Sequence, residues 1–89
     1  MNTVYVLRSI KNGKLYVGST GRSLAIRVTE HNLNGLKWTS GNGPFRLVHY
    51  EIYDSAEIAH KREQFFKTGK GRIVLSNILR TKTQNFTQL

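Results

Sequence analysis

The sequence predicts an α/β (α+β) fold, in which a three-stranded and mainly antiparallel sheet is flanked by helices in the order β-β-α-β-α-α. An Asn12-Gly13 pair separates two runs rich in β-branched and aromatic residues, which is the strongest short-range signal for a β-hairpin. The run from Phe45 to Tyr53 has the composition of a third strand, and the stretch after Asp54 has the spacing of a capped helix. With 89 residues, the chain predicts one domain with a modest core.

The two strands of the predicted hairpin cover residues 4–7 and 15–18. If Asn12 and Gly13 form a two-residue loop, the alternation of side chains assigns each strand residue to one of two faces. One face carries two phenols, a leucine and a glycine: Tyr5, Leu7, Tyr16 and Gly18. The other face is aliphatic throughout and is predicted to be the core side: Val4, Val6, Ile10, Leu15 and Val17. Strand tyrosines are most often packing residues, so a chemical role for them needs support from elsewhere in the chain.

A short helix is predicted after the hairpin, with Ser23 as its N-cap and Leu24 and Val28 as an apolar pair. Arg27 and His31 are also four residues apart, so their side chains project from the same face. Taken alone, this pair indicates an exposed arginine beside an unrelated surface histidine. The alternative is a phosphate site, since a guanidinium fork binds two phosphate oxygens and an imidazole donates to a third or exchanges a proton.

A glycine-rich loop over residues 37–44 precedes the third strand and contains Trp38. Trp38 is either an anchor in the core, which is the more common use of tryptophan, or a platform on which a nucleic-acid base stacks. In the strand that follows, Phe45, Leu47 and Val48 are expected to pack.

The second helix is predicted from Asp54 to about Lys67, because Asp54 and Glu57 have the spacing of a capping box. Gly69 suits the left-handed position that ends such a helix. A short last helix is predicted over residues 71–80, followed by a polar tail over residues 81–89 that frays. Residues 1–80 then form the domain.

An acid interrupts the apolar stripe of the second helix. Ala56, Ala59, Glu63 and Phe66 advance by three or four residues and therefore share a face. A carboxylate on an inward face must be compensated by a cation or by hydrogen-bond donors, because its desolvation is unfavourable. Glu63 is therefore either one half of a partly buried ion pair or a ligand for a metal ion.

The charge of the chain predicts a polyanionic partner. There are 14 lysines and arginines against 5 acids, which gives a net charge of +9. Between residues 61 and 82 the one acid is Glu63, which argues that Glu63 is more than a surface charge. The basic residues expected to contact nucleic-acid phosphates are Lys61, Arg62, Lys67, Lys70 and Arg72, with Arg80 and Lys82 beyond them. The alternatives are a solvated helix face and nonspecific binding of RNA.

Composition excludes several other classes of protein. The chain has no cysteine, which excludes a disulfide framework and thiol catalysis. No apolar run approaches the ~18 residues of a membrane-spanning helix, and the N-terminus lacks the apolar segment of a signal peptide. We therefore expect a soluble, cytoplasmic protein with no membrane partner.

Taken together, the spaced residues resemble the GIY-YIG nucleases. The matching segments are Thr3-Val4-Tyr5 and Tyr16-Val17-Gly18, followed by Arg27 and by Glu63 on a later helix. The resemblance covers residues 4–77 and is closest to the small stand-alone members and to the endonuclease domain of the excision-repair incision subunit. Thr3 stands where the motif has its first glycine, ahead of the tyrosine that takes part in the chemistry.

This resemblance implies a metal-dependent phosphodiesterase that acts on DNA. In the family, the glutamate that matches Glu63 holds one divalent ion, and the tyrosine that matches Tyr5 contacts the attacking water. The arginine that matches Arg27 binds the scissile phosphate.

The resemblance also implies supporting residues. The second tyrosine of the motif, Tyr16 here, orients the site, and Gly18 supports it. His31 matches a histidine that some members carry one turn after the arginine. Asn77 is the candidate for an asparagine that often closes the site.

The residue types agree with a single Mg²⁺ or Mn²⁺ ion. One inward carboxylate, completed by phosphate oxygens and water, suits these oxygen-seeking ions, whereas the absence of cysteine and of paired histidines disfavours Zn²⁺. The ordinary pKa of tyrosine is about 10, so Tyr5 needs help to act as a base. The charges of Arg27 and of the metal are expected to lower that pKa. Direct base and positioner of water both stay open as roles for Tyr5.

Two functions of different classes stay open at this point. The first is a metal-dependent DNA endonuclease of low intrinsic sequence specificity. The second is a nucleic-acid-binding module of the same fold that cuts weakly or only with a partner. A double-strand cut by one site would require a homodimer, a partner protein or two visits. The sequence does not distinguish single-stranded, duplex or branched DNA from RNA.

Overall fold

The computed structural model describes residues 2–33 and 43–87, and the predicted roles of Trp38 lie outside these ranges. Its elements are β1 (Asn2–Ser9), β2 (Leu15–Thr20), α1 (Leu24–Leu33), β3 (Phe45–Tyr53), α2 (Ala56–Phe66) and α3 (Gly69–Thr87). The three strands form one antiparallel sheet in the order β2-β1-β3. The predicted fold class and element order are therefore confirmed.

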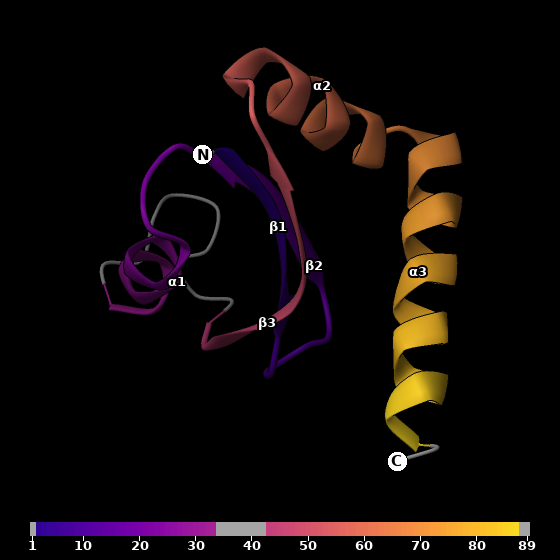
Figure 1. Ribbon diagram of the computed structural model, residues 1–89. Coiled ribbons are helices and arrows are strands. Elements are labelled where there is room, and N and C mark those ends of the chain that lie inside the picture. The colour runs from indigo at the N-terminus through magenta and orange to yellow at the C-terminus, as the bar shows by residue number, and fades with distance from the viewer. Residues whose placement is uncertain (1, 34–42, 88–89) are drawn as a thin grey trace.

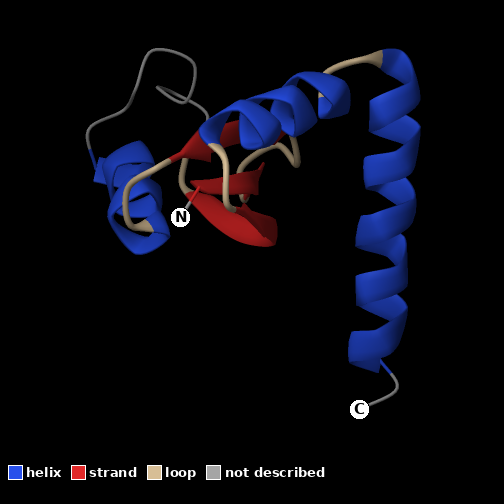
Figure 2. Cartoon of the chain, turned by 45° about the horizontal axis from the view of Figure 1, so that its top comes forward, coloured by secondary structure: helices blue, strands red, loops and turns tan. Residues whose placement is uncertain are grey.

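Helices cover both faces of the sheet (Figure 1). α1 lies on one side, and α2 and α3 lie on the other. α2 runs across the sheet, and α3 turns sharply away from its end (Figure 2). No helix within the described part of the chain is both long and apolar enough to cross a membrane.

Each face of the sheet has its own core. The aliphatic face packs against α2 and α3 through Val4, Val6, Val17, Ala59, Phe66, Leu75 and Leu79. The opposite face packs under α1 through Tyr5, Leu7 and Phe45, with Leu24 and Val28 beside them. The face with the tyrosines is thus also a core face, because β1 is the central strand and both of its sides are buried.

The hairpin loop is longer than predicted. The N–H of Ser9 donates to the carbonyl of Lys14 at 2.8 Å, so the loop comprises residues 10–13 and not Asn12 and Gly13 alone. The Ser9 hydroxyl accepts the N–H groups of Lys11 and Asn12, and Gly13 adopts a left-handed φ of +76°. The two-residue loop was therefore the wrong prediction.

The predicted faces of the hairpin are nevertheless correct. The strands are shifted by two residues relative to the predicted register, and side chains alternate with a period of two. Tyr5 lies opposite Gly18 and Leu7 lies opposite Tyr16. Ile10 is the exception, since it belongs to the loop and is 63% exposed.

A bulge in β3 changes the face of its residues. Val6 pairs with His49 and Leu7 pairs with Leu47, which leaves Val48 as the extra residue. Both Val48 and His49 consequently contact the core under α2 and α3. Leu47 is 38% exposed, so it packs less than expected.

The start of α2 differs from the prediction by one residue. Ser55, and not Asp54, is the N-cap of α2, because its hydroxyl accepts the N–H groups of Glu57 and Ile58. Ala56 is exposed, so the buried stripe of α2 begins at Ala59.

The turn between the two helices uses a hydroxyl in place of a left-handed glycine. Gly69 is the first residue of α3, and Gly13 is the one glycine with positive φ in the described ranges. Thr68 links the helices, since its hydroxyl donates to the Phe65 carbonyl and accepts the N–H of Gly71. α3 continues to Thr87, past the predicted end at residue 80. The division into a domain (1–80) and a tail (81–89) stays a prediction.

Gly71 determines how closely α3 approaches α2, and we expect Gly71→Ala to be strongly destabilising. A Cβ at this position would lie 1.7 Å from the Phe65 carbonyl oxygen, which belongs to backbone and cannot rotate away. We expect the free energy of unfolding to fall by roughly 3 kcal/mol or more, as measured by chemical denaturation. Gly69→Ala is the matched control, since a Cβ there meets nothing within 4 Å. Equal stability of the two variants would contradict the close contact between the helices.

Candidate active site

Tyr5 reaches the edge of the sheet because Gly18 has no side chain. Tyr5 lies on the central strand and is 1% exposed, and its ring crosses Gly18 on the edge strand β2. A Cβ on Gly18 would lie 2.5 Å from the Tyr5 hydroxyl oxygen. Gly18 is therefore a steric requirement for the position of this phenol.

Arg27 and Tyr16 lie beside Tyr5 on the same face. The Arg27 Nε donates to the Tyr5 hydroxyl at 3.3 Å, and the Tyr5 and Tyr16 ring centroids are 6.3 Å apart. Arg27 comes from α1, and the tyrosines come from β1 and β2. The structure thus brings together three of the predicted site residues.

The pKa of Tyr5 is raised in the ion-free protein, although Arg27 lowers it as expected. Burial raises it above its ordinary value of 10.0, and the charges of Tyr16 and Glu63 raise it further. The hydrogen bond and charge of Arg27 lower it, but they do not outweigh burial. In the protein without a bound ion, Tyr5 is therefore protonated at neutral pH, which favours a positioning role over that of a base.

Glu63 meets β2 from the other side of the sheet. Its Oε1 accepts the Ser19 hydroxyl at 2.5 Å, and its Oε2 accepts the Lys67 ammonium at 2.5 Å. His60 Nδ1 lies 3.7 Å from Oε1. Burial raises the pKa of Glu63, but the hydrogen bonds from Lys67 and Ser19 and the charge of His60 outweigh it and lower the pKa. Glu63 is therefore an ionised carboxylate in a nearly buried position.

The two halves of the site meet at neighbouring residues of β2. Gly18 contacts the Tyr5 hydroxyl on one side, and Ser19 holds Glu63 on the other. The charge of Glu63 also acts on the titration of Tyr5, so the two groups lie within electrostatic reach of each other. The structure thus gathers five of the predicted residues near the edge strand β2, with Tyr5, Tyr16, Gly18 and Arg27 on one side of the sheet and Glu63 on the other.

A groove of about 700 Å³ adjoins this site, between β2, the end of α2 and the first part of α3. Part of its lining is apolar and comes from Val17, Phe66 and Leu75. The rest includes Tyr16 and three cations, Lys14, Lys67 and Arg72. The groove borders the candidate site through Tyr16, which packs beside Tyr5, and Lys67, which contacts Glu63.

The two remaining predicted site residues are His31 and Asn77. The side chain of His31 lies outside the described part of the chain, so its role stays a prediction. Asn77 is exposed on α3 and accepts a hydrogen bond from Arg80. It lies away from the inward stripe formed by Leu75 and Leu79, and the polar residues of α3 that line the groove are Arg72 and Ser76. The geometry thus gives no support to Asn77 as a closing residue.

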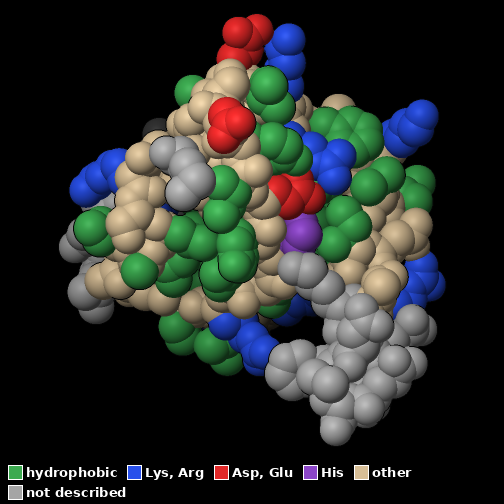
Figure 3. Space-filling view, viewed as in Figure 1, with side chains coloured by type: hydrophobic (Ala, Val, Ile, Leu, Met, Phe, Trp, Pro, Cys, Tyr) green, Lys and Arg blue, Asp and Glu red, His purple; other side chains and the backbone are tan. Residues whose placement is uncertain are grey.

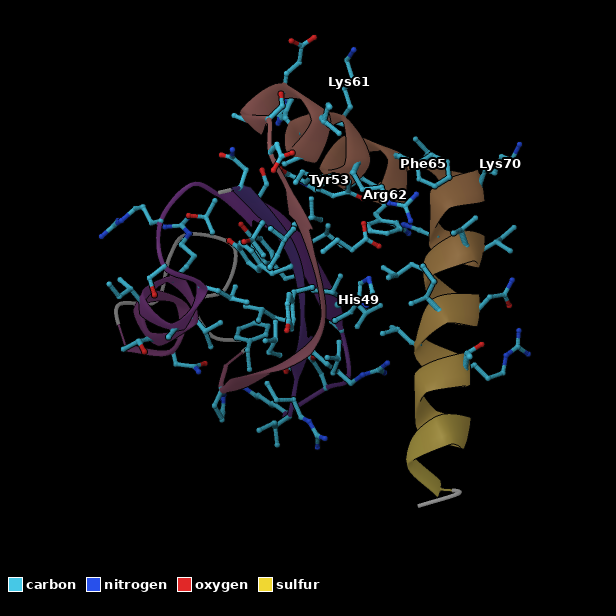
Figure 4. All side chains as sticks on the ribbon, in the orientation of Figure 1. His49, Tyr53, Lys61, Arg62, Phe65 and Lys70 are labelled. Atoms are coloured by element: carbon cyan, nitrogen blue, oxygen red, sulfur yellow. The ribbon has the colours of Figure 1, made fainter. Side chains whose placement is uncertain are left out.

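The basic residues are spread over the surface. Lysine and arginine side chains project at several places around the face shown in Figure 3. Lys61 points away from α2 (Figure 4) and pairs with Glu57 at 3.4 Å, where both side chains are more than 70% exposed. Lys70 is exposed near the start of α3. Arg72 and Lys67 are the two predicted phosphate contacts that line the groove.

Arg62 has an internal role, which sequence reasoning missed. Its guanidinium lies 4.3 Å from the centroid of the Phe66 ring and donates to both carboxylate oxygens of Glu51, at 2.9 and 3.3 Å. Tyr53 and His49 also contact Glu51, at 2.6 and 2.8 Å. Figure 4 shows His49, Tyr53 and Arg62 on the side of β3 that faces α2 and α3. We therefore leave Arg62 out of the proposed nucleic-acid contacts.

The sequence does contain a signal for this network. His49, Glu51 and Tyr53 alternate along β3 and so project from one face of the strand. The structure shows the partly buried ion pair that the sequence analysis left open for Glu63, and its cation is Lys67, four residues later on the same helix. The second partner, Ser19, was not predicted.

Glu63 fits a site with one carboxylate ligand. The described residues contain no group of three or more His, Asp or Glu side chains that could hold an ion. The Oε2 atom of Glu63 already accepts a cation, the Lys67 ammonium, and the carboxylate stays ionised. The position therefore suits a cation whose remaining ligands are water and substrate oxygens.

Residues 1–75 match the family model described as the GIY-YIG catalytic domain. The chain belongs to the GIY-YIG family. This confirms the resemblance inferred from the two tyrosine motifs, Arg27 and Glu63. A GIY-YIG domain is generally a nuclease domain, and GIY-YIG nucleases typically use a divalent metal ion.

Small GIY-YIG proteins of the UPF0213 group are similar to this chain over most of its length. A UPF0213 protein of Clostridium perfringens is 35% identical over 97% of this chain and 94% of its own. One from Natronomonas pharaonis is 42% identical over 73% of this chain and 75% of its own. The solution NMR structure of a UPF0213 protein from Bacillus halodurans is 34% identical, has a TM-score of 0.52, and covers 88% of this chain and 85% of its own.

The network around Glu51 predicts a stability contribution that depends on pH. Burial raises the pKa of Glu51, but hydrogen bonds from Arg62, Tyr53 and His49 outweigh it and lower the pKa from 4.5 to about 2. The contribution is complete above pH 4.5 and is lost as the pH falls toward 2. At pH 7 we expect Glu51→Gln to lower the free energy of unfolding by about 2–3 kcal/mol, with the difference from wild type shrinking below pH 4.

Chemical denaturation at several pH values tests this expectation. Glu57→Gln is the control, because Glu57 belongs to an exposed ion pair on the same helix as Arg62 and should have little effect at any pH. A difference between Glu51→Gln and wild type that stays constant down to pH 2.5 would contradict the assignment.

Proposed function

We propose that this protein is a divalent-metal-dependent endonuclease that hydrolyses phosphodiester bonds in DNA. The observation that supports this most is the convergence of Tyr5, Arg27 and Glu63 at residues 18–19 of β2, beside a groove lined by cations. Phosphodiester hydrolysis builds negative charge on the phosphate oxygens and needs an oriented water. The site offers a guanidinium for the first requirement and a phenol for the second.

In this proposal Glu63 holds one Mg²⁺ or Mn²⁺ ion, which acts as a Lewis acid on the phosphate and makes bound water more acidic. Ser19 fixes the carboxylate through Oε1. The described part of the chain holds no cluster of three or more His, Asp or Glu side chains around Glu63, which is consistent with one ion and with most of its ligands coming from water and substrate.

Tyr5 and Arg27 are proposed to act as a pair. The Tyr5 hydroxyl is proposed to position the attacking water, since burial raises its pKa in the ion-free protein and a neutral phenol can donate a hydrogen bond to that water or accept one from it. Arg27 orients this phenol through Nε. A guanidinium presents five N–H donors, so the same residue also binds a phosphate oxygen whose charge grows in the transition state. Tyr16 packs beside Tyr5 and extends the site into the groove.

The groove is proposed to bind the strand that is cut. Lys14, Lys67 and Arg72 would contact backbone phosphates, and such contacts carry no sequence information. This supports low intrinsic sequence specificity. One site cuts one strand, so cleavage of a duplex would require a homodimer, a partner protein or two successive encounters. Lys61 and Lys70, which are exposed, would add nonspecific attraction.

We expect Glu63→Gln to abolish cleavage of labelled DNA in Mg²⁺ or Mn²⁺ while DNA binding measured without metal is retained. The amide preserves the shape of the side chain and removes the charge that holds the ion. Glu57→Gln, on the exposed face of the same helix, is the control and should cut like the wild type. Undiminished cutting by Glu63→Gln, or in excess chelator, would exclude the metal assignment and favour a nucleic-acid-binding module whose cleavage is weak or depends on a partner.

We expect Arg27→Ala and Arg72→Ala to separate chemistry from binding. Arg27→Ala should lower the single-turnover rate at saturating DNA on the order of 100-fold or more, because it removes a donor aimed at transition-state charge. Arg72→Ala should mainly weaken binding and reduce the slope of its salt dependence by about 0.9 for each duplex phosphate that is no longer neutralised. The measurements are binding without metal and single-turnover cleavage with metal, at two or more salt concentrations. A saturating rate that survives in Arg27→Ala would contradict the proposed mechanism.

A further inference from the structure

The Lys67 ammonium is bound to Oε2 of Glu63, the residue that we propose as the metal ligand. The ammonium lies 2.5 Å from Glu63 Oε2, while Ser19 holds Oε1 at the same distance. The carboxylate is nearly buried, with a side-chain exposure of 12%, whereas Lys67 is 45% exposed. Lys67 is also the C-cap of α2 and lines the groove. The lysine thus lies between the carboxylate and the groove.

A divalent ion and this ammonium cannot share Oε2 in the arrangement described. Mg²⁺ binds a carboxylate oxygen at about 2.1 Å. With the ammonium 2.5 Å from the same oxygen, the two cations would stand within a few ångströms of each other and repel strongly. We therefore expect the ion to displace the Lys67 ammonium, whereas the hydrogen bond from Ser19 to Oε1 can stay.

We propose that Lys67 is a positioning residue that takes the place of the divalent ion on Glu63 in the ion-free protein, and that ion binding transfers its ammonium to the groove. This inference rests on the proposed metal-dependent function. It assigns to Lys67 two successive partners, the carboxylate of Glu63 first and a substrate phosphate afterwards.

The position of Lys67 allows this exchange without movement of the backbone. Glu63 and Lys67 are four residues apart on one helix, so their contact depends on the rotamers of a flexible four-carbon stem. The groove that receives the ammonium already contains Lys14 and Arg72, and a phosphate bound there would draw Lys67 away from Glu63. Metal and phosphate binding would then favour each other, because coupling between two sites is reciprocal.

The test measures Mn²⁺ binding to the protein without DNA, by the loss of the free Mn²⁺ EPR signal. We expect Lys67→Met to bind Mn²⁺ about tenfold more tightly than the wild type, since the ion no longer displaces a charge-assisted hydrogen bond. Lys70→Met is the matched control, because it removes the same charge from an exposed lysine three residues later and should change the affinity far less. Glu63→Gln should lose the site.

The outcomes distinguish this inference from the proposed function on which it rests. If Glu63→Gln loses Mn²⁺ binding but Lys67→Met binds no more tightly than Lys70→Met, the metal site stands and the exchange is overturned. If Glu63→Gln binds Mn²⁺ like the wild type, the metal assignment is itself overturned, and the exchange with it.

A second measurement uses the wild-type protein and so does not depend on the folding of a variant. In a Mg²⁺ titration followed by NMR of the lysine side chains, the Lys67 signals should shift toward those of a solvated lysine as the ion binds. The same signals should already be close to that position in Glu63→Gln and should not respond to Mg²⁺. Lys67 signals that stay unchanged while Mg²⁺ saturates the wild-type site would overturn the exchange.

Discussion

Glu63 brings a negative charge into the interface between α2 and the sheet, and the arrangement of the site follows from how that charge is stabilised. A carboxylate in such a position is tolerated only when donors replace the water that it gives up on burial. Ser19 provides one donor from β2, and Lys67 provides another from the end of the same helix. The first contact holds α2 against the edge strand, and the second points to the groove. The same donors that keep the carboxylate ionised therefore hold it at the edge strand, within electrostatic reach of the Tyr5 phenol.

The carboxylates of Glu51, on β3, and Glu63, on α2, are compensated differently. Glu51 receives the guanidinium of Arg62, a phenol and an imidazole, which together use both of its oxygens in fixed geometry. Glu63 receives a hydroxyl and a flexible ammonium. An arginine fork that also stacks on Phe66 is suited to permanent packing, whereas a lysine at a helix end is suited to exchange. The contrast fits a structural role for Glu51 and the proposed ligand-binding role for Glu63.

The positions of the two tyrosines on the sheet and the approximate start of α2 could be predicted from the sequence, because each depends on a few neighbouring residues. The alternation of residues 4–7 and 15–18 assigns Tyr5, Tyr16 and Gly18 to one face, and that assignment survives an error of two residues in the loop. The start of α2 was wrong by one residue, since Asp54 and Ser55 are both good caps and only the tertiary path of the chain selects between them.

Long-range partners were not predictable in the same way. The pairing of Arg62 with Glu51 depends on the packing of α2 over β3, and a positive charge in a basic stretch gives no hint of it. The pKa of Tyr5 is raised because Tyr5 is buried on the central strand of the sheet. The hairpin alone would not bury it. Asn77 is exposed because α3 packs its apolar residues against the sheet and leaves Asn77 on another face. The orientation of α3 depends in turn on its close contact with α2 at Gly71, which the sequence does not reveal.

The loop over residues 10–13 has a consequence for how the site assembles as the chain folds. It brings Tyr5, Tyr16 and Gly18 together through a short closure, whose entropic penalty is small. Ser19 and Glu63 are 44 residues apart, and their contact requires β3 and α2 to be in place first. The half of the site that contains the phenols is thus a local structure, and the carboxylate half is a product of the complete topology. A chain that has formed only its hairpin contains the tyrosine motif without the carboxylate.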